Sequence, residues 1–361
     1  MKRIGIVVAV LGMCAWSFGQ GDKKPATQSA PAGQAAAAAP QGKRPPQAKT
    51  QPEFETYRTA IAITGPLAMD GHITAGQAVL TSARNSFTAG MSGFKVNISG
   101  AGPNGATLST SIASYQSPTQ VTLTDKAATT TTAATVSGAG DIATFEKAAN
   151  DFAAKFPDSE LRVVLFKAVM QGYQQANNAD KMLEMAQKAL AVDPDEPEAL
   201  VGVAQVLTER TRETDLDRDQ KLAEAKKDAE RALETVNTDV PTAGYPPERI
   251  DQFKRYVQSE AYAVLGTIAS NLEKWADAET NLRKSIDVFP EQVDSVAVLR
   301  LAIALDKQGK YPDALKSANQ AVDLTKDRAD SPAGQAARAE QDRLTKLNSG
   351  TAPGGAAPPK N

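Results

Sequence analysis

Cysteine and histidine are almost absent from this chain of 361 residues, which contains only Cys14 and His72. A zinc site of the Cys/His type needs about four such ligands, and this chain has only these two, so it cannot form such a site. A disulfide framework is excluded as well, and Cys–His or Ser–His–Asp chemistry would have to use His72. The composition therefore argues against several classes of enzyme and metalloprotein, and we expect no metal and no cofactor.

Charge of one sign and aromatic side chains are also scarce. The chain has 40 basic and 42 acidic residues, a net charge of −2, and 5% aromatic residues. It lacks the basic excess that marks nucleic-acid-binding proteins, so nucleic acid is not an expected partner. Abundant alanine and few aromatic residues suit thinly packed helices better than an aromatic-rich β core, and the length allows about two domains.

Residues 1–19 have the three parts of a signal peptide. The basic pair Lys2-Arg3 precedes an apolar run over residues 4–15, and small residues follow up to Gly19. The run is shorter than the roughly 20 apolar residues of a membrane-spanning helix. We therefore expect cleavage near Gly19, export to the periplasm or the exterior, and no transmembrane span in the processed chain.

Cys14 offers an alternative, the lipid anchor of a bacterial lipoprotein. The lipidation box would be Leu11-Gly12-Met13-Cys14, with Met13 where the lipoprotein pattern has a small residue. Cleavage after Gly19 remains the main prediction, and it would leave the processed chain without cysteine.

Two low-complexity segments flank the predicted fold. Residues 20–52 consist mainly of Ala, Pro, Gln, Gly and Lys, and residues 348–361 form a similar Gly/Pro/Ala tail. Such segments bury too little apolar surface to offset their conformational entropy. We expect both to be disordered, the first as a tether.

Residues 63–140 read as a small β-rich module. They contain five charged residues, and apolar residues alternate at Val96/Ile98 and at Val121/Leu123, as in half-buried strands. Short strands are predicted at residues 77–81, 95–99, 109–114 and 120–124. Parts of the module, such as Lys95–Gly102 and Ser114–Leu123, look similar to modules of bacterial secreted and phage-tail-like proteins, which implies a surface role.

Residues 141–347 are predicted to be helical and repetitive. The segments 188–194, 284–290 and 320–326 align in one register, and the last two begin 36 residues apart. This spacing is close to the period of about 34 residues in tetratricopeptide repeats.

The chain resembles the tetratricopeptide repeat (TPR) family at the positions that pack one helix on the next. The best copy carries the family's aromatic residue, its Leu-Gly pair, its small and large residues and its closing proline at Tyr262, Leu265, Gly266, Ala278, Leu282 and Pro290. The resemblance implies a mainly α fold, a solenoid of helix pairs with a small all-β insertion. It also implies a concave groove that binds proteins or peptides.

The insertion is inferred from the helices on either side of the β module. Residues 53–62 have apolar residues at helical spacing, and Asp141 is placed to cap a second helix that ends at Pro157. Joined directly, the two would form one ordinary helix pair. We therefore predict that the module is inserted into the turn of the first repeat; a separate N-terminal β domain is the alternative.

Sites for catalysis are weakly indicated. The acids Asp215, Asp217 and Asp219 lack the glycine and the distal glutamate of a calcium loop, and no phosphate-binding loop is present. Hydrolysis through Asp70 and His72 is the remaining enzymatic hypothesis. The sequence favours a protein that is not an enzyme.

The candidate binding residues lie on the first helices of the repeats, where the family's groove is lined. Their side chains are mixed, without a strong net charge: Lys167, Gln171, Gln174, Gln205, Glu260, Thr267, Asn271 and Arg300. Some TPR proteins clamp a peptide's C-terminal carboxylate with Lys, Asn and Arg. Lys167 and Arg300 match such basic positions, but the accompanying asparagines are missing.

The leading hypothesis is therefore a noncatalytic exported scaffold or adaptor that docks a peptide or helix of other envelope or secreted proteins. A solvated helix face without a partner is the plainer reading of each candidate residue. The alternative function is a surface or carbohydrate-binding protein that acts through the β module. Its three aromatic residues, Phe87, Phe94 and Tyr115, are few for a glycan platform.

Overall fold

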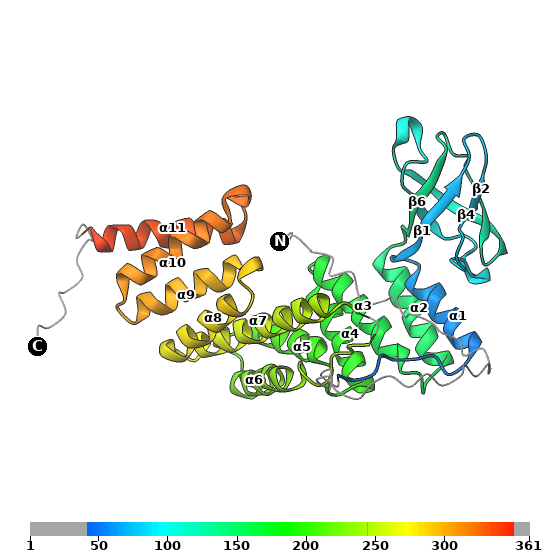
Figure 1. The fold of residues 1–361 in the computed structure, drawn as a ribbon. Helices are drawn as coiled ribbons and strands as arrows, with labels where there is room; N and C mark the ends of the chain where they lie inside the picture. Colours follow the sequence, from blue (N-terminus) through cyan, green and yellow to red (C-terminus); the bar gives the residue numbers. More distant parts are fainter. Residues whose placement is uncertain (1–41, 244, 350–361) are drawn as a thin grey trace, which may run out of the picture. The chain divides into compact units, whose positions relative to one another are not determined.

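The computed structural model describes residues 42–243 and 245–349, in which eleven α-helices and six β-strands form (Figure 1). The chain is mainly helical with a small all-β module, as predicted. The contacts of the described residues divide it into two compact units, residues 46–194 on the one hand and residues 42–45, 195–243 and 245–349 on the other. The predicted signal peptide, Cys14 and the tail beyond Ser349 lie outside the described residues.

The β module is a closed six-stranded barrel with the strand order β1-β2-β5-β4-β3-β6 and antiparallel neighbours. Its strands are β1 (Pro66–Ile73), β2 (Val79–Thr81), β3 (Lys95–Ile98), β4 (Leu108–Ser117), β5 (Gln120–Leu123) and β6 (Thr131–Gly138). The alternating residues Val96, Ile98, Val121 and Leu123 all lie in its core. Closure leaves the sheet without a free edge.

The sequence did not predict β1 and β6, and their pairing explains why. The register between them shifts three times from Pro66 to Ile73, so β1 lacks a strict two-residue period. Strand β6 consists of Thr, Ala, Val, Ser and Gly, which gives little hydrophobic contrast along the strand. Bulges of this kind hide a strand from a search for strict alternation.

The barrel enters and leaves the helical part through a narrow neck. Gly138 donates its N–H to the Gly65 carbonyl at 2.8 Å, and Gly140 donates to the Ile63 carbonyl at 2.9 Å. A Cβ atom on Gly138 would lie 2.1 Å from the Ala62 carbonyl oxygen. Only glycine fits such an approach, so this residue lets the two chain segments pair.

Helices α1 (Gln51–Ile61) and α2 (Ile142–Lys155) pack together beside this neck (Figure 1). The Tyr57 and Phe152 rings meet edge to face with centroids 6.4 Å apart. Glu53, which is 2% exposed, accepts hydrogen bonds from the Lys49 N–H and the Ser159 hydroxyl. Helix α1 thus packs on the pair that follows the barrel. That arrangement is the one an insertion requires, although the insertion itself stays a prediction.

Two further helices complete this unit, within the stretch that the sequence predicts to be helical. They are α3 (Leu161–Gln175) and α4 (Ala179–Val192), which pack on each other. Asp141 caps α2 by accepting the Thr144 N–H at 2.8 Å. The close approach of α2 to α3 uses Gly172, where a Cβ atom would lie 2.3 Å from Ile142 Cδ1.

The second unit contains seven helices within the described residues. They are α5 (Pro197–Arg210), α6 (Arg218–Thr235), α7 (Pro247–Asn271), α8 (Trp275–Val288), α9 (Ser295–Lys307), α10 (Tyr311–Leu324) and α11 (Pro332–Asn348). Consecutive helices pack as pairs through small residues. Gly266 of α7 faces Leu282 of α8, and a Cβ atom added at Gly266 would lie 2.6 Å from Leu282 Cγ, so both residues are packing positions between the two helices. The fold is therefore TPR-like.

Two features of this unit depart from a regular repeat. Helix α7 has 25 residues, because it continues well before the repeat position of Tyr262. Helix α11 packs on α9 and α10, and its Leu344 is completely buried in their core. It therefore covers the apolar face that the last repeat would otherwise expose.

A short segment of the predicted linker is attached to the second unit. Lys43 donates its N–H to the Thr238 carbonyl at 3.0 Å, and its ammonium lies 3.6 Å from Asp239 Oδ1. Both partners belong to the connection between α6 and α7. Over residues 42–243 and 245–349, no helix combines the length and the apolar character that crossing a membrane requires.

Candidate partner-binding groove

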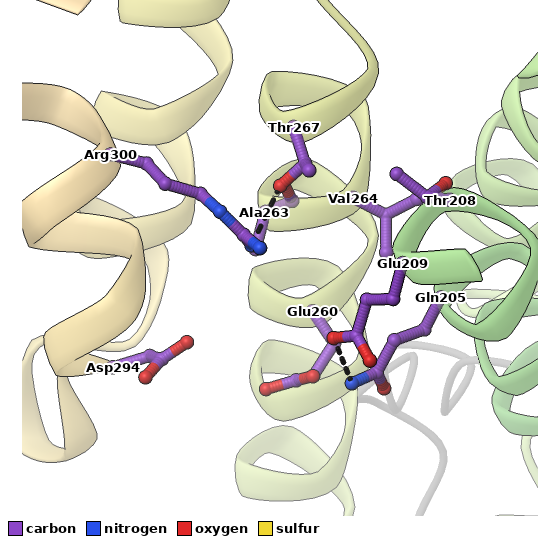
Figure 2. Close-up of a pocket in the computed structure, with 9 residues that line it drawn as sticks. All are labelled: Gln205, Thr208, Glu209, Glu260, Ala263, Val264, Thr267, Asp294 and Arg300. Atoms are coloured by element: carbon purple, nitrogen blue, oxygen red, sulfur yellow. Dashed lines mark hydrogen bonds between the residues drawn. The ribbon is translucent and has the colours of Figure 1, made fainter. Parts of the chain in front are cut away.

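Three helices of the second unit, α5, α7 and α9, line an open hollow of about 310 Å³, a volume that includes solvent space (Figure 2). Its lining residues are Gln205, Thr208, Glu209, Glu260, Ala263, Val264, Thr267, Asp294 and Arg300. Four of the eight predicted residues are brought together here: Gln205, Glu260, Thr267 and Arg300. We call this hollow the groove.

Helical periodicity places these side chains. Glu260, Ala263, Val264 and Thr267 are three or four residues apart and form one stripe along α7. A neighbouring face of the same helix carries Gly266, which packs on α8. Because the apolar faces are used between paired helices, the polar stripes are left to the groove.

A hydrogen bond joins α7 to α9 inside the groove. Arg300 Nη1 donates to Thr267 Oγ1 at 2.9 Å, and that hydroxyl donates to the Ala263 carbonyl at 2.8 Å. Thr267 is 6% exposed, so its hydroxyl forms part of the groove's floor. Figure 2 shows the Arg300 side chain reaching from α9 toward α7.

The α5 side of the groove is also hydrogen-bonded. Gln205 Nε2 donates to Glu209 Oε1 at 3.0 Å, one helical turn away. Thr208, which is 3% exposed, donates its hydroxyl to the Ala204 carbonyl at 2.7 Å. At the start of α9, Asp294 Oδ1 accepts the Val296 N–H at 3.0 Å as the helix cap.

The lining is acidic, which differs from the mixed groove expected from the sequence. Glu209, Glu260 and Asp294 contribute three carboxylates against the single guanidinium of Arg300. Sequence reasoning missed Glu209 and Asp294. Glu209 follows Gln205 by four residues, so the stripe along α5 is the signal that would have found it. Asp294 precedes α9 as an N-cap residue, and its capping role gives no sign in the sequence that it also lines the groove.

The other four predicted residues do not line this groove. Lys167, Gln171 and Gln174 form a half-buried stripe on α3, in the unit of residues 46–194. Asn271 ends α7, where its carbonyl accepts a hydrogen bond from the Arg218 guanidinium.

The α3 stripe lies on the helix that also carries Tyr173, which joins α3 to α2 and α4. The Tyr173 hydroxyl donates to Glu146 of α2, and Lys181 of α4 binds the same carboxylate at 2.8 Å. Burial first, and then the bond to Glu146, raise the pKa of Tyr173 to about 12. This network holds three helices together, so we assign it a structural role.

Asp70 and His72, the residues of the enzymatic hypothesis, both lie on β1. Asp70 accepts the Ser82 hydroxyl at 2.6 Å and the Ala83 N–H at 3.2 Å, which fixes the loop after β2. His72 lies exposed on β1. In the part of the chain that the structure describes, no three or more His, Cys, Asp or Glu side chains gather as metal ligands would.

The aromatic residues of the barrel are used for its core. Phe87 is 1% exposed, and Phe94 and Tyr115 pack against the same core cluster. Phe87 therefore offers no ring on which a sugar could stack, and the rings of Phe94 and Tyr115 are half-buried.

No protein-family model matches the chain, and no curated protein matches its sequence. Among solved structures it is similar to YrrB, described as a TPR protein with an unusual peptide-binding site, at 16% identity and a TM-score of 0.36, over 56% of this chain and 84% of that one. TTC0263, a thermophilic TPR protein of Thermus thermophilus, matches at 12% identity and a TM-score of 0.38, over 56% and 90%. The MamA protein matches at 14% identity and a TM-score of 0.32, over 52% of this chain and 89% of that one.

Proposed function

We propose that this protein is a noncatalytic scaffold that binds a segment of a partner protein in the groove of α5, α7 and α9. The observation that carries the proposal is the convergence of polar side chains from three helices on one open hollow. These helices bury apolar faces against their paired helices, while the polar side chains line the groove, where Arg300 also joins α9 to α7. Their arrangement supports binding.

The shape of the groove favours a peptide over a small molecule. Small-molecule pockets occupy about 300–1,000 Å³ and enclose most of their ligand. The groove's volume of about 310 Å³ includes open solvent, so it would leave a small ligand largely exposed. An extended or helical segment can instead run along the groove and contact several helices in turn.

We further propose that the protein is exported and that its partners are other envelope or secreted proteins. The support is the three-part pattern of residues 1–19. Intact-mass measurement of the native protein should show a chain that begins near Gln20. A chain that retains Met1 would contradict export through this signal, and a diacylglyceryl mass on Cys14 would establish the lipoprotein alternative.

Site-specific photocrosslinking in the native cell tests the binding site. A photoreactive amino acid at Gln205 should capture a discrete partner protein, whereas the same probe at the exposed Glu248 of α7 should not. A third probe at the exposed Val79 of β2 examines the barrel. Capture at Val79 but not at Gln205 would move the function to the β module, and equal capture at all three positions would contradict a specific groove.

A further inference from the structure

The groove offers more hydrogen-bond acceptors than donors. The guanidinium of Arg300 binds Thr267, the amide of Gln205 binds Glu209, and both threonine hydroxyls donate to their own helix. A carboxylate can accept about four hydrogen bonds through its two oxygens. The known bonds of Glu209 and Asp294 involve one oxygen each, so acceptor capacity remains in the groove.

The walls suit a long cationic side chain. Ala263 provides a half-buried apolar surface on α7, between Glu209 of α5 and the start of α9 (Figure 2), and Val264 beside it is 5% exposed. Lysine and arginine bury their aliphatic stems on such a surface while their charged ends contact acids. Glu260 and Asp294 are half-buried, whereas Glu209 is exposed, and partial burial strengthens the attraction between opposite charges relative to bulk water.

Resting on the proposed function, we propose that the partner is a basic peptide segment that places a lysine or arginine side chain in the groove. Three carboxylates against one guanidinium give the groove the complementary charge. The alkyl stem packs on Ala263, and the cationic end contacts Glu209 and Glu260. This is the opposite of a clamp for a C-terminal carboxylate, in which Arg300 would bind the partner directly.

Arg300 distinguishes the two modes. In the proposed mode it is a like charge beside the incoming cation, so Arg300→Gln should strengthen binding about two- to fivefold, as expected for a partly exposed charge pair. In a carboxylate clamp the same substitution removes the main contact and should weaken binding.

The test is a random 12-residue peptide library, displayed on phage and selected on immobilised chain of residues 20–361. A selected peptide is then synthesised with a fluorescent label, and its dissociation constant is measured by fluorescence anisotropy. Its Lys or Arg residues are next replaced by acetyl-lysine or citrulline, which keep the shape and remove the charge. The protein variants are Glu209→Gln with Glu260→Gln, Arg300→Gln, and the control Glu248→Gln on the same helix as Glu260.

We expect enrichment of Lys- and Arg-containing peptides. Their affinity should fall about two- to fivefold for each groove carboxylate removed. Added salt should weaken binding to the wild type more steeply than binding to the double variant. Glu248→Gln should leave it unchanged. Hydrogen exchange of each variant checks that the helices remain folded.

Two results would overturn the inference, and they differ in whether the proposed peptide-binding function is also contradicted. Peptides that bind in the groove without a basic preference, or more weakly after Arg300→Gln, contradict the cationic ligand but keep the peptide-binding function. Selection that yields no peptide sensitive to any groove substitution contradicts both.

Discussion

Gly140 donates its backbone N–H to the Ile63 carbonyl at 2.9 Å, so the residues that end and begin the β module are hydrogen-bonded neighbours. The ladder of β1 and β6 continues into this contact through the bond from Gly138 to Gly65. Domains whose ends lie close together can be inserted into an exposed turn without spreading the flanking structure. The barrel therefore has the geometry of a removable module.

Replacing residues 63–140 with a short Gly/Ser turn should leave the helices folded. The loss would include the Arg58 bond to the Asn85 carbonyl at 2.5 Å and the contact of the Thr59 and Thr88 hydroxyls at 2.7 Å. Those contacts lie on the barrel side of α1, whereas Tyr57 packs on Phe152 of α2. The helical circular dichroism signal, divided by the number of helical residues, should equal that of the intact chain. Helices α1 to α4 should still melt in one cooperative transition. Loss of cooperative melting would instead make the barrel part of the helical core.

Leu282→Ala should lower the free energy of unfolding by about 2–5 kcal/mol, as expected for a large residue removed from a packed core. Leu282 of α8 is fully buried against α7. Denaturant unfolding followed through the fluorescence of Trp275, at the start of α8, measures the change. Leu324→Ala is the matched control, because Leu324 is 39% exposed and should cost much less. Equal effects at both sites would contradict this packing.

Gly266 and Leu282 should be energetically coupled. An alanine Cβ at position 266 would lie 2.6 Å from Leu282 Cγ, a separation that forces the helices apart. Gly266→Ala should therefore destabilise the wild type despite alanine's better helix propensity of about 1 kcal/mol. In the Leu282→Ala background most of that cost should disappear. A double-mutant cycle with additive effects would show that this contact does not limit the approach of α7 and α8.

The sequence predicted the packing of helices where the packing residues follow the spacing of the repeat. The Leu-Gly pair at Leu265 and Gly266 identified a helix contact that the structure contains. Groove residues were harder to find, because Glu209 and Asp294 carry no repeat signal and become neighbours of Glu260 only through packing of three helices. Helix α11 was not singled out, since its sequence is rich in alanine and polar residues with few large apolar side chains.

Asp228→Asn should stabilise the protein at neutral pH and not at acidic pH. Burial on α6, with the neighbouring charge of Glu224, raises the pKa of Asp228 from its ordinary 3.8 to about 6. A raised pKa means that the folded state binds more protons than the unfolded state between these two values. Stability from this residue therefore falls as pH rises from about 4 to about 6, and the full penalty is present above that range.

The asparagine variant lacks the charge and should be more stable at pH 7 by on the order of 1 kcal/mol, a value reduced for partial solvent screening. Its advantage should shrink as pH falls through 6 and vanish near 4. Other carboxylates, such as Glu279, have a lowered pKa and give the whole protein the opposite trend. The decisive quantity is thus the difference between wild type and variant in denaturant unfolding from pH 4 to 7. Asp287→Asn, an exposed position on α8, is the control and should show no such dependence. A difference at Asp228 that stays constant over this range would contradict the raised pKa.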